Sequence, residues 1–132
     1  MSERDSETRA RVLVVAARLF AASGFKKVTV REICREADAN IAAVNYHFGD
    51  KLGLYREVLF KAIETMRGTT DAARQAGEGQ APEERLRIYI RVFLQRVVGQ
   101  GQDSWIHQFM QQEMTDPTPA LDMVIDQVIR PR

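Results

Sequence analysis

The chain has 132 residues, of which 45% are hydrophobic and 28% charged, and its formal net charge is +1. This composition is typical of a soluble globular protein with one domain or two small ones. No apolar run is long enough to cross a bilayer, and the charged N-terminus lacks a signal-peptide core. The single cysteine, Cys34, excludes an internal disulfide, so we expect a cytoplasmic protein.

Basic residues concentrate in the first half of the chain. Between Thr8 and Phe60 there are nine Lys/Arg and five Asp/Glu, whereas residues 61–132 contain nine Lys/Arg and ten Asp/Glu. The first segment therefore carries a net charge of +4 and the second a net charge of −1. The excess is mild, but it marks the first segment as the place for contact with phosphates.

Apolar residues recur at helical spacing throughout the chain, and no sustained alternation predicts a strand, so we expect an all-α fold. The first helix is expected at residues 8–23, ended by Gly24 as a left-handed cap. The second is expected at residues 30–37. Thr29 is its predicted N-cap, and Glu32, three residues later, completes a capping box.

A short turn separates the second predicted helix from the third. Asn40 is the predicted N-cap of a helix at residues 41–48, and Gly49 ends it. Asp50 then caps a fourth helix, which continues to about residue 67. On the third helix, three apolar residues are expected to point inward: Ile41, Val44 and Phe48.

The second half of the chain predicts further helices after a linker at residues 68–81, which has no apolar stripe. Pro82 begins a helix that ends near Gly99, and helices at about 104–114 and 119–128 follow. We therefore expect a helix-turn-helix domain at residues 8–52 and a separate helical domain at residues 82–132. The predicted inner face of the helix after Pro82 comprises Leu86, Tyr89, Ile90, Phe93 and Val97.

The third helix suits insertion into a DNA major groove. A recognition helix needs small or polar residues outward, an apolar face inward, and flanking groups that hold phosphates. The small outward side chains let the helix axis approach the bases, and helix N-termini favour phosphates. Lys26 and Lys27 could extend the phosphate track. The predicted DNA-contact residues are Thr29, Arg31, Asn40, Ala42, Ala43, Asn45, Tyr46, His47 and Lys51.

The segments LFAASGF, TVREIC and NIAAVNYHFGDKLGLY resemble the N-terminal DNA-binding domain of the TetR/AcrR family of bacterial transcriptional regulators. The resemblance covers residues 8–59 without a gap, and the hexapeptide YHFGDK is its most specific part. It implies a homodimer on a palindromic operator. It also implies that residues 82–132 belong to an effector and dimerisation domain, and that a small molecule bound by these C-terminal helices releases a repressor from DNA.

The sequence departs from this family at two places. The family usually has Tyr where Asn45 stands, so Asn45 could read adenine, reach a phosphate or bridge through water. Tyr46 and His47 match the aromatic residue and the His that are usual in the family, so the resemblance implies DNA contact for these two residues more directly. The segment HQFMQQEMTDPTPALDMVIDQVIRPR resembles the early part of the C-terminal domain of one TetR subgroup, and the chain is shorter than such regulators. We therefore expect a truncated C-terminal domain and weak self-association.

A group of aromatic and Met side chains in the second half suits a lipophilic effector. The same residues could instead pack the helices against one another. The candidate effector-pocket residues are Tyr89, Phe93, Trp105, Phe109, Met110 and Met114.

The alternatives to a ligand-responsive repressor are a small DNA-binding or interaction module without an effector, and an enzyme. The enzyme is disfavoured because the sequence has two histidines, one cysteine, no Gly-rich phosphate loop and no paired metal-ligand spacing. We expect no cofactor, no metal and no catalytic residue. Glu113 is the one acidic side chain of the last helices that could point inward. Cys34 is expected to be an inert core residue.

Overall fold

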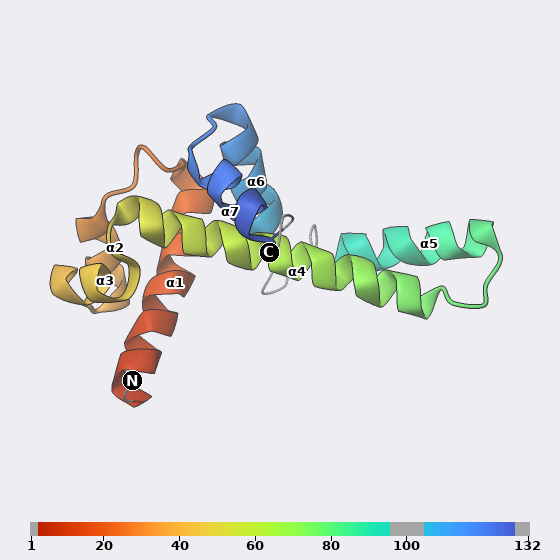
Figure 1. Ribbon diagram of the computed structural model, residues 1–132, viewed down its shortest axis with the longest axis horizontal. Coiled ribbons are helices and arrows are strands. Elements are labelled where there is room, and N and C mark those ends of the chain that lie inside the picture. Colours follow the sequence, from red (N-terminus) through yellow and green to blue (C-terminus); the bar gives the residue numbers. More distant parts are fainter. Residues whose placement is uncertain (1–2, 96–104, 129–132) are drawn as a thin grey trace.

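The computed structural model describes residues 3–95 and 105–128 (Figure 1). Every element in that part of the chain is a helix, which confirms the predicted all-α fold. None of these helices is long and apolar enough to span a membrane. The helices are α1 (Glu3–Ser23), α2 (Val30–Ala37), α3 (Ile41–Phe48), α4 (Lys51–Ala76), α5 (Pro82–Phe93), α6 (Trp105–Thr115) and α7 (Ala120–Val128).

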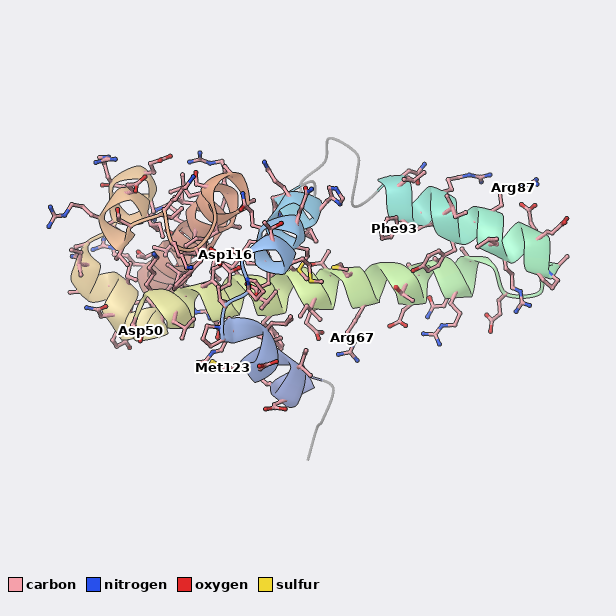
Figure 2. The ribbon with its side chains drawn as sticks, turned by 90° about the horizontal axis from the view of Figure 1, so that it is seen from above. Asp50, Arg67, Arg87, Phe93, Asp116 and Met123 are labelled. Carbon is pink, nitrogen blue, oxygen red and sulfur yellow. The ribbon has the colours of Figure 1, made fainter. Side chains whose placement is uncertain are left out.

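The long helix α4 forms the axis of the molecule. Its 26 residues span about 39 Å at 1.5 Å per residue. Helices α1, α2 and α3 surround its first turns, whereas α5 turns back along its far half (Figure 1). Helices α6 and α7 lie near the middle of α4, on opposite sides of it when the molecule is seen from above (Figure 2). The recognition helix α3 and helix α5 therefore occupy opposite ends of an elongated molecule.

One hydrophobic core joins the first four helices to α6 and α7. The Tyr55 ring lies 5.0 Å from the Phe20 ring and 5.0 Å from the Phe109 ring, measured between centroids. Ile106, Phe109 and Val124 are fully buried in the same cluster as the apolar faces of α1 to α4. The division into domains at residues 8–52 and 82–132 stays a prediction, but the two segments share this core.

Helix α1 begins at Glu3, five residues before the predicted start at Thr8. The Thr8 hydroxyl donates to the carbonyl of Arg4, 3.0 Å away, so it bonds within the helix and does not cap it. Glu3 and Asp5 lie in the first turn, where negative charge favours a helix N-terminus.

Helix α4 continues to Ala76, so the predicted end near Arg67 and the predicted linker at 68–81 are wrong. The connection to α5 is only residues 77–81. Two interactions explain the extra turns: Ala73 is buried beneath α5 at 2% exposure, and Asp71 pairs with Arg74 on the helix surface. The packing of Ala73 against α5 is a tertiary contact, and a search for an apolar stripe could not detect it.

Two predicted apolar faces are more exposed than expected. Leu86 and Ile90 on α5 are 60% and 47% exposed, and Tyr89 is 38% exposed. Phe93 lies on the side of α5 that faces α4, and Arg87 points away from it (Figure 2). Val97 and Gly99 lie outside the described residues. Ile41, the first residue of α3, is 46% exposed, whereas Val44 and Phe48 on the same predicted face are buried.

Candidate nucleic-acid interface

The turn of the helix-turn-helix is closed by backbone and arginine hydrogen bonds. Asp38 ends α2 in the left-handed conformation, with φ of 54°, and its N–H donates to the carbonyl of Cys34. Arg11, on α1, donates from Nε to the Ala37 carbonyl at 2.9 Å and from Nη2 to the Asp38 carbonyl at 3.2 Å. Arg11 thereby satisfies carbonyls that the end of α2 leaves free.

Removing the Arg11 guanidinium should lower the free energy of unfolding by about 1 kcal/mol, since two charged hydrogen bonds to backbone are replaced by water. Arg11→Met keeps most of the stem and tests this by urea denaturation. Arg18→Met is the matched control, because Arg18 also joins α1 to α2 but only through an exposed ion pair with Glu36. It should cost less than about 0.5 kcal/mol. Equal destabilisation by both substitutions would contradict a special role for Arg11.

The recognition helix exposes the residues that the sequence predicts. Tyr46 is 72% exposed, and its ring meets the His47 ring edge-on at 4.9 Å. Ala42 and Asn45 are exposed, whereas Ala43 and His47 are half-buried. Val44 is fully buried and Phe48 is 8% exposed, so the opposite face locks α3 against the core. The outward face is therefore small at its start and aromatic at its end.

The predicted N-caps of α2 and α3 are confirmed, and this limits what two candidate residues can offer DNA. The Thr29 hydroxyl accepts from the Glu32 N–H at 3.1 Å, and the Glu32 carboxylate accepts from the Thr29 N–H at 3.2 Å, which completes the capping box. The Thr29 hydroxyl also donates to that carboxylate at 3.1 Å. The Asn40 side-chain Oδ1 accepts from the Ala43 N–H at 2.7 Å. Thr29 thus leaves mainly the N–H groups of the first turn for a phosphate, and Asn40 leaves its amide NH₂.

Lys51 occupies the first turn of α4, beside the end of the recognition helix. The Asp50 carboxylate caps that turn by accepting from the Gly53 N–H at 2.7 Å, as predicted. The Lys51 Nζ lies 4.3 Å from the centroid of the Phe25 ring. Partial burial lowers the pKa of Lys51, and the nearby Glu32 carboxylate opposes that shift. The ring fixes this ammonium at a helix N-terminus, where phosphates bind favourably.

The other cations around α3 differ in their freedom to meet a phosphate. Lys26 pairs with Asp116 at 3.3 Å, across from the α1–α2 loop to the end of α6. Among the ion pairs of residues 3–95 and 105–128, none involves Lys27, Arg31 or Lys51. Arg31 and Lys27 are exposed, so they and Lys51 are the cations best placed for the phosphate track.

In the part of the chain that the structure describes, the six candidate effector-pocket residues are spread over two grooves, the core and the exposed surface. Phe109 is fully buried in the core, whereas Met114 is 70% exposed. Met110 lines an open groove of about 470 Å³ between α4 and α6, and Tyr89 lines another of about 590 Å³ between α4 and α5. The remaining two pack locally: Phe93 stacks on Tyr89 and Trp105 meets Phe109 edge-on. Sequence reasoning missed the α4 side of the first groove, which is lined by Ile63, Met66, Arg67, Thr70, Asp71 and Arg74.

Two family matches cover most of the chain. Residues 12–58, which contain the helix-turn-helix just described, match the family described as "Bacterial regulatory proteins, tetR family". Residues 82–132 match the family described as "HTH-type transcriptional dual regulator CecR, C-terminal domain". The chain belongs to the TetR family.

Two curated relatives of this TetR-family chain are also regulators by name. It is 32% identical over 79 residues to "Probable HTH-type transcriptional regulator YttP" of Bacillus subtilis (strain 168), covering 60% of the chain and 38% of that protein. It is 27% identical over 139 residues to "HTH-type transcriptional dual regulator CecR" of Shigella flexneri, covering 99% of the chain and 62% of that protein. The chain thus spans less than two thirds of the length of either relative. Both names describe transcriptional regulators.

Three residues important to this TetR-family surface lay outside the sequence predictions. Arg11 closes the turn, and Gly53 allows α4 to begin against the end of α3, where an added Cβ would lie 2.0 Å from the Phe48 carbonyl oxygen. Gln112, on α6, donates to the carbonyls of Ala21 and Ala22 at the end of α1. Arg11 and Gln112 act through contacts between segments far apart in the chain, so no local pattern could reveal them. Gly53 acts on Phe48, in the preceding helix, through the angle between α3 and α4, which the helix pattern does not specify. Within the described residues, no cluster of three or more His, Cys, Asp or Glu could hold a metal ion.

Proposed function

We propose that this chain is a DNA-binding transcriptional regulator that binds a palindromic operator as a homodimer. The observation that carries the proposal is the outward face of α3, which exposes Ala42 and Tyr46, the latter to 72%, and which Lys51 follows in the first turn of α4. Small side chains admit the helix to the groove, and the flanking helix N-termini and cations hold the backbone in register. A homodimer supplies a second helix-turn-helix, which the other half of a palindrome requires.

Operator binding should weaken steeply as salt rises. If Lys27, Arg31 and Lys51 each neutralise one phosphate per subunit, the plot of log K against log salt should have a slope of roughly −5 for the dimer. The measurement is fluorescence anisotropy at several salt concentrations, on a duplex selected from a random DNA pool. A slope near zero, or no enrichment of any sequence, would count against the proposed function.

Repression is the proposed outcome of operator occupancy, released by a small lipophilic effector. The groove between α4 and α6 supports that class, because Ile63, Met66 and Met110 offer apolar surface and Arg67 a charged rim. The relative from Shigella flexneri is described as a dual regulator, so a promoter fusion must be scored for both activation and repression. Repression lifted by an apolar compound is the expected result. The proposed setting is the cytoplasm, where the operator lies.

A further inference from the structure

Glu113, on α6, is a buried carboxylate that the proposed function has not used. It is 1% exposed. Its Oε1 accepts from the Tyr55 hydroxyl at 2.6 Å and from the Thr118 hydroxyl at 3.0 Å, and its Oε2 accepts from the Thr118 N–H at 2.9 Å. None of the ion pairs among the described residues involves it. A buried carboxylate is costly to hold, and hydrogen bonds are what stabilise this one.

Tyr55 links Glu113 to Phe25, which lies next to the candidate DNA-contact residue Lys51. Tyr55 is 1% exposed, and its ring meets the Phe25 ring edge-on at 4.9 Å. Burial, and then the hydrogen bond to Glu113, raise the pKa of the Tyr55 hydroxyl. The hydroxyl therefore stays protonated at neutral pH and remains a donor to the carboxylate. With its hydroxyl and its ring both held, Tyr55 has little freedom to rotate.

Phe25 completes the path, because its ring lies between Tyr55 and Lys51. The Lys51 Nζ is 4.3 Å from the Phe25 centroid, and Lys51 is four residues before Tyr55 on α4. Residues four apart lie on the same face of a helix. The Phe25 ring thus rests on Tyr55 from one side and supports the ammonium on another.

We propose that Glu113 is a positioning residue for DNA binding, acting through Tyr55 and Phe25 to set where the Lys51 ammonium meets a phosphate. The inference rests on the proposed function only for the phosphate contact. The link from Glu113 to Lys51 exists in the free protein and can be tested there. A purely structural role for Glu113, limited to holding the turn at Thr118, makes different predictions.

Two substitutions separate these roles, because each removes one hydroxyl donor from the same oxygen, Glu113 Oε1. Tyr55→Phe breaks the path to Phe25 and keeps the ring. Thr118→Val leaves that path intact and removes in addition the contact of the Thr118 hydroxyl with the Ala120 N–H. The control is therefore at least as disruptive to local structure as the test variant. Circular dichroism and thermal unfolding verify that both variants fold.

The first readout is the NMR chemical shift of the Lys51 ε-methylene protons in the free chain. The ring current of Phe25 should shift this signal away from that of an exposed lysine. Tyr55→Phe should move this signal towards that of an exposed lysine, whereas Thr118→Val should leave it displaced. An unchanged signal in Tyr55→Phe, or equal changes in both variants, would overturn the positioning role. This readout needs no DNA, so a failure of the proposed function would not be mistaken for a failure of the link.

The second readout is affinity for the selected duplex in a double-mutant cycle with Lys51→Met. Tyr55→Phe should weaken binding by roughly threefold and lower the salt slope by up to about 0.9 for each phosphate that Lys51 no longer neutralises. In the Lys51→Met background it should have no further effect, since the ammonium it positions is gone. The same factor in both backgrounds would overturn the proposal, and so would full affinity in Tyr55→Phe.

Discussion

Replacing Gly53 with alanine is expected to lower the free energy of unfolding by about 3 kcal/mol and to abolish DNA binding with it. Gly53 lies in the first turn of α4, where a Cβ would stand 2.0 Å from the Phe48 carbonyl oxygen and 3.2 Å from its carbonyl carbon. The obstacle is backbone at the end of the recognition helix, so no side-chain rotation can relieve it. Either α3 or the start of α4 must move.

Urea denaturation followed by circular dichroism measures this effect, and Gly68→Ala is the matched control. Gly68 lies in the same helix, is exposed, and has nothing within 4 Å of an added Cβ. Alanine should therefore stabilise that position by about 0.5–1 kcal/mol through its better helix propensity. The two substitutions should have opposite signs. A stabilising Gly53→Ala would show that the approach of α4 to α3 is looser than described.

Replacing Tyr46 with alanine should weaken operator binding by about 30-fold per subunit and leave the fold intact. The side chain is 72% exposed and its ring packs edge-on against the neighbouring His47, so its removal should change stability by less than about 0.5 kcal/mol. A contact of such a residue with a base edge or a phosphate contributes about 2 kcal/mol, which corresponds to that factor. Anisotropy titration of the selected duplex provides the measurement.

Tyr89→Ala is the matched control for Tyr46→Ala, because it makes the same substitution at the other end of the molecule. Tyr89 lies on α5, beside the far half of α4, and is 38% exposed. It should leave DNA affinity unchanged. Equal affinity of Tyr46→Ala and the parent chain would remove Tyr46 from the contact surface. A parallel decrease in affinity in both variants would indicate a general effect on folding, which thermal unfolding would detect.

The sequence predicted the helix-turn-helix almost residue by residue, because its signals are local. Thr29, Asn40 and Asp50 each cap the helix they were expected to cap, and each bond spans three residues. Gly49 ends α3 at φ of 87°, a conformation that favours glycine. These choices depend only on neighbours in the chain, so one sequence suffices to find them.

The rest of the surface could not be predicted, because it depends on contacts between segments far apart in the chain. Arg11 was one charged residue among several on α1, and only the folded chain brings it to the Asp38 carbonyl. The helical pattern lets Glu113 point inward but does not identify its partner Tyr55, which is 58 positions away. The arrangement of the proposed effector residues could not be predicted for the same reason, since helical spacing says which face of a helix is apolar and not what covers it.

The core shared between α1, α4 and α6 has a consequence for how the protein is made. Phe109 and Ile106 fill space beneath Phe20 and Tyr55, which leave the ribosome more than 50 residues earlier. Until α6 emerges, the nascent helix-turn-helix keeps an uncovered apolar face, and such surface invites chaperones and aggregation. The DNA-binding end of the chain is thus synthesised first but completed late. Its folding should depend on translation continuing past Asp116, where the Lys26 ion pair closes over the α1–α2 loop.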